Sequence, residues 1–113
     1  MRACLTKLQV GTRDVTEADC DPVDYRYIVT TAYATSTDVT ITLKTGVTLS
    51  SLQFMAAPDP GSANAPIYSG STSTPSGTIT WRGGSRATIR LTMDVPEIGE
   101  KELLLDIIRE PNS

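Results

Sequence analysis

Residues 77–95 read GTITWRGGSRATIRLTMDV, and apolar and polar side chains alternate along most of this stretch. Before the glycine pair, Ile79 and Trp81 alternate with threonine and arginine. After it, every second residue from Ala87 to Val95 is apolar. A period of two over this length is typical of β-strands with one buried face and one solvent-exposed face. The stretch therefore predicts two half-buried strands.

The connection WRGGSR suggests how these two strands meet. A turn of the two glycines alone would mix core and solvent faces, which strand register avoids. A three-residue loop over 83–85 instead pairs Trp81 with Ala87. It also pairs Ile79 with Ile89, so that the apolar side chains fall on one side. Glycine is the residue expected at the left-handed position of such a loop. We therefore expect a β-hairpin here.

Further strands follow from alternation or from a high content of β-branched and aromatic residues. The segment KELLLDIIR has some helix propensity, but it continues an all-β pattern and is predicted as a strand. Turn residues separate the strands, at spacings typical of a sandwich. We predict an all-β fold, a single antiparallel Ig-like β-sandwich of about seven strands spanning residues 1–113. The other predicted strands are 5–10, 25–34, 38–44, 49–56, 101–109 and a short edge strand at 67–68; segments 11–24, 58–66 and 69–76 are predicted loops, and 96–100 a turn.

Composition limits the classes of partner. The 113 residues suit one domain, and 39% hydrophobic and 20% charged residues suit a globular chain. The net charge of −3 argues against duplex nucleic acid, which favours a basic surface. The first ten residues, MRACLTKLQV, lack the apolar run of about 7–15 residues that marks an export signal. No stretch approaches the ~20 apolar residues of a membrane span. We expect neither nucleic acid nor membrane as a partner.

The usual catalytic motifs are missing from the sequence. It contains no histidine, so the common general base and the common triads are absent. It also has no phosphate-binding loop, dinucleotide fingerprint or nucleophile elbow. A serine–lysine enzyme is not excluded by composition alone. We expect a protein that is not an enzyme and that needs no cofactor.

Two features suggest covalent or metal chemistry, and each has a simpler interpretation. Cys4 and Cys20 either form a disulfide or stay as free thiols, and the lack of an export signal favours free thiols. Without histidine they make a poor zinc site. The acidic segment 14–24 offers carboxylates for calcium, but it lacks the spacing and central glycine of an EF-hand. A solvated loop is the simpler interpretation, so no metal site is expected.

Two stretches carry a resemblance. Residues 27–51, YIVTTAYATSTDVTITLKTGVTLSS, and 77–107, GTITWRGGSRATIRLTMDVPEIGEKELLLDI, resemble the Ig-like conserved-repeat domains of bacterial and archaeal surface proteins. The similarity covers about residues 25–108. It departs from the family pattern at 35–37, where an asparagine-containing turn is usual, and at 44–46, where Pro-Ala-Gly is usual. The resemblance implies an Ig-like sandwich and assigns no functional residue.

Three arginines form the first candidate contact. In the predicted hairpin, Arg82, Arg86 and Arg90 share the outward face. Like charges close together on a sheet destabilise it. Either nearby acids such as Asp94 and Glu97, or water, compensate them, or the arginines face an anion or a protein partner. Arginine is enriched at protein interfaces, so the second interpretation makes them candidate interface residues.

The last predicted strand supplies the second candidate contact. Alternation sends the residues Leu103, Leu105 and Ile107 to the core. It leaves Leu104 and Ile108 on the outward face, beside Glu102 and Asp106. Two aliphatic residues on one wet strand face can seed a patch that another subunit covers. The alternative is that a loop of the same chain covers them.

Three classes of function remain after these exclusions. The first is a structural subunit of a larger assembly, such as a phage capsid decoration or accessory virion protein. The others are a cell-surface or adhesive Ig-like module and a glycan-binding module. The missing export signal disfavours the second class, and a content of one Trp, four Tyr and one Phe disfavours the third.

We therefore expect a virion protein assembled in the host cytoplasm, present as a homo-oligomer or in many copies. Its partners would be protein subunits of the same assembly, such as those of a capsid shell. If 67–68 is not a strand, one sheet edge is open to a partner strand.

Overall fold

A computed structural model of the chain describes residues 5–15, 20–21, 26–57 and 65–111. These residues form strands and no helix, which confirms the all-β prediction. The described residues contain ten strands rather than about seven. The prediction missed β2 and β3 because two residues are too few to show alternation. The strands are β1 Leu5–Val10, β2 Arg13–Asp14, β3 Cys20–Asp21, β4 Arg26–Thr31, β5 Ser36–Leu43, β6 Thr48–Ala57, β7 Ile67–Tyr68, β8 Gly77–Thr80, β9 Arg86–Val95 and β10 Gly99–Arg109.

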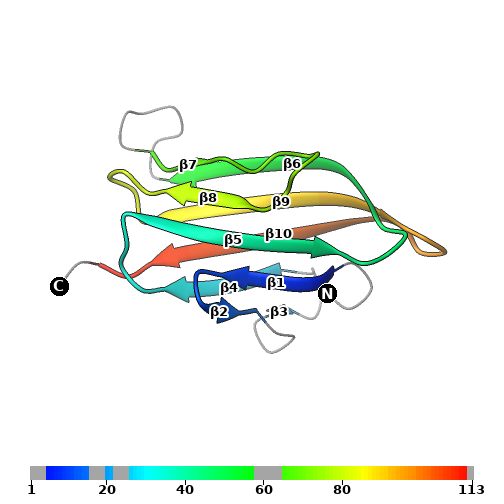
Figure 1. Ribbon diagram of the computed structural model, residues 1–113, viewed down its shortest axis with the longest axis horizontal. Coiled ribbons are helices and arrows are strands. Elements are labelled where there is room, and N and C mark those ends of the chain that lie inside the picture. Colours follow the sequence, from blue (N-terminus) through cyan, green and yellow to red (C-terminus); the bar gives the residue numbers. More distant parts are fainter. Residues whose placement is uncertain (1–4, 16–19, 22–25, 58–64, 112–113) are drawn as a thin grey trace.

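The strands form two five-stranded sheets stacked face to face (Figure 1). The sheet that lies in front in Figure 1 has the order β2-β1-β5-β8-β7 and is called the β5 sheet. The sheet behind it has the order β3-β4-β10-β9-β6 and is called the β10 sheet. Within the described residues every pairing is antiparallel except that of β4 with β10, which is parallel. The predicted β-sandwich is confirmed, but one of its sheets is mixed.

The predicted hairpin at WRGGSR is wrong. β8 belongs to the β5 sheet and β9 to the β10 sheet, so the connection 81–85 crosses from one layer to the other. Trp81 and Ala87 are both buried, as are Ile79 and Ile89, but they are not cross-strand neighbours. Two strands with one apolar side each can pair within a sheet or face each other across a core. Both arrangements give the same alternation of apolar and polar residues in the sequence, so alternation does not distinguish them.

The turn at this connection also differs from the expectation. The left-handed backbone conformation falls on Arg82, with φ of 59°, and on neither Gly83 nor Gly84. The amide of Gly84 donates to the carbonyl of Trp81 over 3.0 Å, which closes the turn. Arg82 therefore occupies the backbone position at which glycine would be least strained.

The core fills the space between the two sheets. It contains the inward residues predicted on β10, since Leu103, Leu105 and Ile107 are each at most 1% exposed. The strand interpretation of KELLLDIIR and its division into two faces are thus confirmed. Other fully buried members of the core are Leu8, Val10, Tyr27, Val29, Ile79, Trp81, Ile89, Leu91 and Met93.

The four sheet edges are unequal. The β5 sheet ends in β2 and β7, and one edge of the β10 sheet is β3; each of these three strands has two residues. The remaining edge is β6, with ten residues. The predicted edge strand at 67–68 is confirmed as β7. The formation of β7 does not remove the long open edge, because that edge is β6 and belongs to the other sheet.

Candidate protein-interaction face

The candidate site is the outer face of the β10 sheet, the side that points away from the β5 sheet. The strands β4, β10, β9 and β6 contribute its side chains, because alternate residues of each strand point outward. Strand register arranges these side chains in rows across the sheet. One row holds Arg26, Leu104, Arg90 and Gln53; the next holds Ile28, Asp106, Thr88 and Met55; the third holds Thr30, Ile108 and Arg86.

Four of the five predicted interface residues meet on this face. Leu104 lies directly opposite Arg90, and Ile108 lies directly opposite Arg86. Both aliphatic side chains are half-buried among their neighbours. The predicted place of Arg82 on the same face as Arg86 and Arg90 is wrong, because this residue lies in the crossover turn. Its place on the face depended on a hairpin that does not form.

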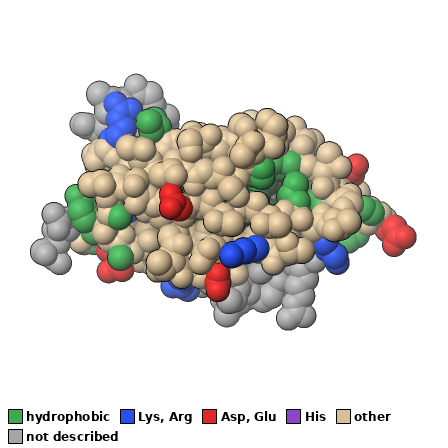
Figure 2. Space-filling view, in the orientation of Figure 1, with side chains coloured by type: hydrophobic (Ala, Val, Ile, Leu, Met, Phe, Trp, Pro, Cys, Tyr) green, Lys and Arg blue, Asp and Glu red, His purple; other side chains and the backbone are tan. Residues whose placement is uncertain are grey.

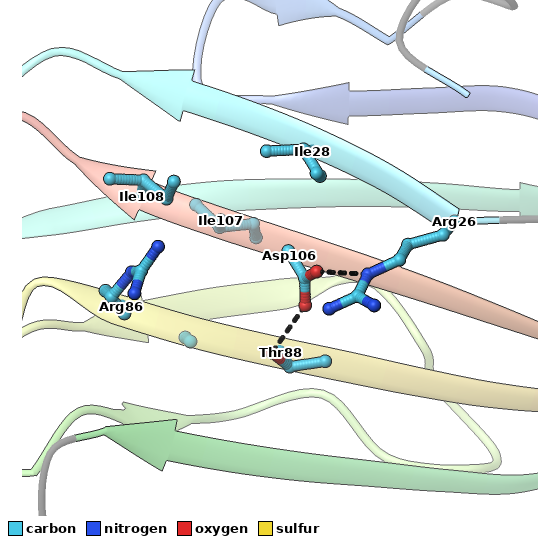
Figure 3. Close-up of a pocket in the computed structure, with 8 residues that line it drawn as sticks. Arg26, Ile28, Arg86, Thr88, Asp106, Ile107 and Ile108 are labelled. Atoms are coloured by element: carbon cyan, nitrogen blue, oxygen red, sulfur yellow. Dashed lines mark hydrogen bonds and ion pairs between the residues drawn. The ribbon is translucent and has the colours of Figure 1, made fainter. Parts of the chain in front are cut away.

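A groove of about 280 Å³ opens on the face (Figure 3). Arg26 and Ile28 come from β4, and Asp106 and Ile108 from β10, while β9 contributes Arg86 and Thr88. Figure 3 shows Arg26 and Thr88 reaching Asp106 from opposite sides, with Arg86 and Ile108 at the other end of the groove. The groove thus joins a polar network to an aliphatic end.

Internal partners compensate most of the charge on the face. The carboxylate of Asp106 accepts hydrogen bonds from Arg26 Nε and from Thr88 Oγ1, each over 2.7 Å. Arg90 Nε lies 3.3 Å from Glu102 Oε1. The acid that compensates Arg90 is therefore Glu102; within the described residues neither Asp94 nor Glu97 makes an ion pair with these arginines.

Arg86 differs from the other two arginines of the face. Its guanidinium makes no ion pair or hydrogen bond with any residue in the part of the chain that the structure describes. Its side chain is exposed and lies opposite Ile108 at the aliphatic end of the groove. An uncompensated guanidinium beside an aliphatic surface offers donors to a carboxylate of another molecule.

Several members of the face are not among the residues predicted from the sequence. Ile28 is 55% exposed and Met55 is 40% exposed. Period-two alternation in YRYIVTT predicts that Ile28 points away from Tyr27 and Val29, so its outward direction was readable. Its position beside Asp106 could not be predicted from the sequence, because β4 and β10 are far apart in the sequence and pair in parallel.

The opposite face of the molecule is different. Figure 2 views the molecule from the β5 sheet, and uncharged polar side chains and backbone cover most of the middle of this face. Its outward residues include Thr40, Thr42, Thr78 and Thr80. The groove with two arginines and three isoleucines belongs to the β10 sheet.

No group of three or more histidine, cysteine or carboxylate side chains in residues 5–15, 20–21, 26–57 and 65–111 is arranged to hold a metal ion. The calcium hypothesis for segment 14–24 falls mostly outside the described residues. Cys4 also lies outside them, as does the side chain of Cys20. Over the same described ranges, no helix is long and apolar enough to cross a membrane.

Comparison with known proteins adds no relative: no protein-family model, no curated protein and no solved structure matches the chain. The fold therefore defines the class, an all-β protein of two stacked sheets, one of them mixed. A function has to be argued from the surface.

Proposed function

We propose that this chain is a non-enzymatic structural subunit of a larger protein assembly, and that the groove on the β10 sheet is its contact with the neighbouring subunit. The observation that carries the proposal is Arg86, a cation without a partner in the described residues, at the edge of a groove whose other charges are compensated. The partner surface is one that brings a carboxylate to Arg86 and apolar side chains to Ile28 and Ile108.

The aliphatic contribution to such a contact is modest. Full burial of a large aliphatic side chain stabilises by about 1.5–3 kcal/mol. Leu104 and Ile108 are already half-buried, so a partner gains only a fraction of this from them. Ile28, which is 55% exposed, gains the most. A contact of this strength suits an assembly in which many copies bind together.

The particular assembly proposed is a phage capsid shell, with this chain as a decoration or accessory virion protein. Support for this choice comes from exclusion: the sequence contains no catalytic motif, and its acidic composition argues against nucleic acid. Fold alone does not define a function. The choice therefore depends on the experiment that follows.

The test is binding to shells purified without this protein. The chain is mixed with shells, the shells are pelleted, and bound chain is measured against concentration. We expect saturable binding in many copies per shell. Arg86→Glu reverses the charge at the groove and is expected to weaken binding at least tenfold. The matched control is Arg82→Glu, which makes the same charge change outside the face and should bind as the wild type does.

Two results would contradict the proposal. A wild-type chain that stays in the supernatant at every concentration is not a shell subunit. Equal binding by the folded Arg86→Glu variant would mean that another surface makes the contact. A further variant, Leu104→Ser with Ile108→Ser, tests the aliphatic end, provided that its circular dichroism spectrum shows an intact fold.

A second candidate, a cell-surface or adhesive Ig-like module, is supported by strand order. An Ig-like sandwich has strands A, B, E and D in one sheet and C, F and G in the other. The order β1-β5-β8-β7 corresponds to the first set, and β6-β9-β10 to the second. Labelling intact cells with a membrane-impermeant amine reagent separates the two candidates, because only a surface module reacts before the cells are opened.

A glycan-binding role has less support. Glycan sites commonly present exposed aromatic rings, and Tyr33, at 44% exposed, is the one aromatic residue among the described residues that is more than a third exposed. Its ring stacks on the guanidinium of Arg109 at 4.6 Å, so one ring face already has a partner. A single aromatic ring with one face already covered offers little surface for a sugar ring to stack on.

A further inference from the structure

The edge strand β6 (Thr48–Ala57) carries a second interaction surface. Its sequence, TLSSLQFMAA, contains no charged residue and no proline. Proteins commonly protect sheet edges with very short strands, charges or proline, because unpaired backbone groups bind other strands. The three other edges follow this rule, since each is a two-residue strand. β6 has none of these three features; its one irregularity is a register shift between Leu49 and Ser51, which leaves Ser51–Ala57 regular.

The backbone of β6 is paired on one side. It pairs with β9 from Thr48 to Ala57, and no backbone hydrogen bond joins it to any other described segment. The register shifts between Leu49 and Ser51, so the regular part of the edge is the seven residues from Ser51 to Ala57, about 23 Å long at about 3.3 Å per residue. This edge has room for a complete partner strand.

Side chains along β6 also remain incompletely covered. Leu52 and Phe54 point inward and pack against the core, but both are only partly buried. Met55 points outward and is 40% exposed. A strand added beside β6 would cover apolar surface on both faces of the sheet, in addition to satisfying backbone groups.

We propose that β6 pairs antiparallel with β6 of a second copy of this chain, which joins two β10 sheets into one continuous ten-stranded sheet. A second copy fits because a two-fold axis pairs the strand with itself in antiparallel register, so that each residue faces the one equally far on the other side of the central residue. A charged strand would repel itself there, and β6 carries no charge.

Pairing through β6 also determines the direction in which the outer faces of the two copies point. A two-fold axis perpendicular to the joined sheet leaves the outer faces of both copies on the same side. The two grooves with Arg86 would then point in one direction and could contact a partner together. The inference goes beyond the proposed function, and it stands on β6 without requiring the groove to bind anything.

The first test is the mass of the wild-type protein in solution. Sedimentation analysis is expected to give twice the chain mass of 12.1 kDa. Hydrogen exchange measured across a dilution series should show β6 amides losing protection as the dimer dissociates. A wild-type chain that remains monomeric at its highest soluble concentration overturns the inference.

Charge substitutions test the pairing itself. Pairing centred on Gln53 sets Ser51 of one copy opposite Met55 of the other. The lysine variant, Ser51→Lys with Met55→Lys, and the glutamate variant, Ser51→Glu with Met55→Glu, should each be monomeric, because like charges face each other. An equimolar mixture of the two variants should restore the dimer mass. The control is Thr30→Lys with Thr80→Lys, which adds two charges at exposed strand positions away from β6 and should remain dimeric.

Several outcomes would overturn the pairing. If either variant stays dimeric, the interface lies elsewhere; if the mixture stays monomeric, β6 does not face β6. These results are separable from the shell experiment. A monomeric wild-type chain that still binds shells through Arg86 refutes the dimer alone, whereas a dimer that binds no shell refutes the proposed function alone.

Discussion

Arg109 lies over the indole ring of Trp81, with its guanidinium carbon 5.3 Å from the ring centroid. The side chain is nearly buried, at 8% exposed, and Tyr33 covers it at 4.6 Å. Its guanidinium donates to the carbonyls of Ala34 and Gly84, over 2.7 and 2.6 Å. The crossover turn, the β4–β5 connection and the end of β10 are thus held together by one side chain.

Replacing Arg109 with leucine should destabilise the fold. The change leaves two carbonyls without a donor and removes two cation–π contacts. We expect a loss of about 2–4 kcal/mol in the free energy of unfolding. Urea unfolding followed by Trp81 fluorescence measures it. The exposed Lys44→Ala change should stay within about 0.5 kcal/mol of the wild type, and an equally small effect of Arg109→Leu would show that the guanidinium contributes little.

The indole nitrogen of Trp81 supplies the next prediction. Trp81 Nε1 donates to Thr37 Oγ1 over 2.8 Å, and both residues are buried. Thr37→Val keeps the shape but leaves the indole N–H without an acceptor, which should cost about 1–3 kcal/mol. The same change at the exposed Thr30 is the control. A Thr37→Val protein with wild-type stability in a urea titration would indicate that another acceptor replaces the hydroxyl.

The β9–β10 turn is strained at Glu97. The amide of Ile98 donates to the carbonyl of Val95, Pro96 comes second in the turn, and Glu97 comes third with φ of 70°. This position favours glycine or asparagine. Glu97→Gly should therefore stabilise the protein by about 0.5–1 kcal/mol. Glu97→Ala keeps the strain and should change little, so equal stabilisation by both substitutions in thermal melting would rule out strain as the cause.

Stability should fall at alkaline pH because of Tyr68. Burial raises the pKa of the Tyr68 hydroxyl from 10.0 to about 12, and this hydroxyl donates to the carbonyl of Pro75. Between these two pH values the unfolded state loses the Tyr68 proton while the folded state keeps it, so the unfolded state is favoured as pH rises. The difference in unfolding free energy between the wild type and Tyr68→Phe should shrink from pH 10 to pH 12. A constant difference would contradict the raised pKa.

Alternation made the inward and outward sides of the strands readable. Leu103 and Leu105 went to the core as expected, and Leu104 went outward. The same reasoning failed for the arginines as a group. Arg86 and Arg90 share a face because both lie on β9, while Arg82 depended on a turn whose partner strand was assumed.

The candidate site was predictable only in part. Leu104, Ile108, Arg86 and Arg90 were identified because they lie on strands with clear alternation. Other groove residues were not found. Arg26 meets Asp106 across 80 positions of sequence, through a parallel pairing that no local pattern indicates.

By itself the sequence determined that the chain is all-β and which side of its long strands faces the core. It did so because side chains of a strand alternate in direction, and burial selects apolar residues on one side. Only the tertiary structure decided which strands pair, which long edge of the described sheets is left open, and that Arg86 has no ion-pair or hydrogen-bond partner among the described residues. Backbone hydrogen bonding between strands is nearly independent of side-chain identity, so pairing is settled by how all the apolar faces are buried together.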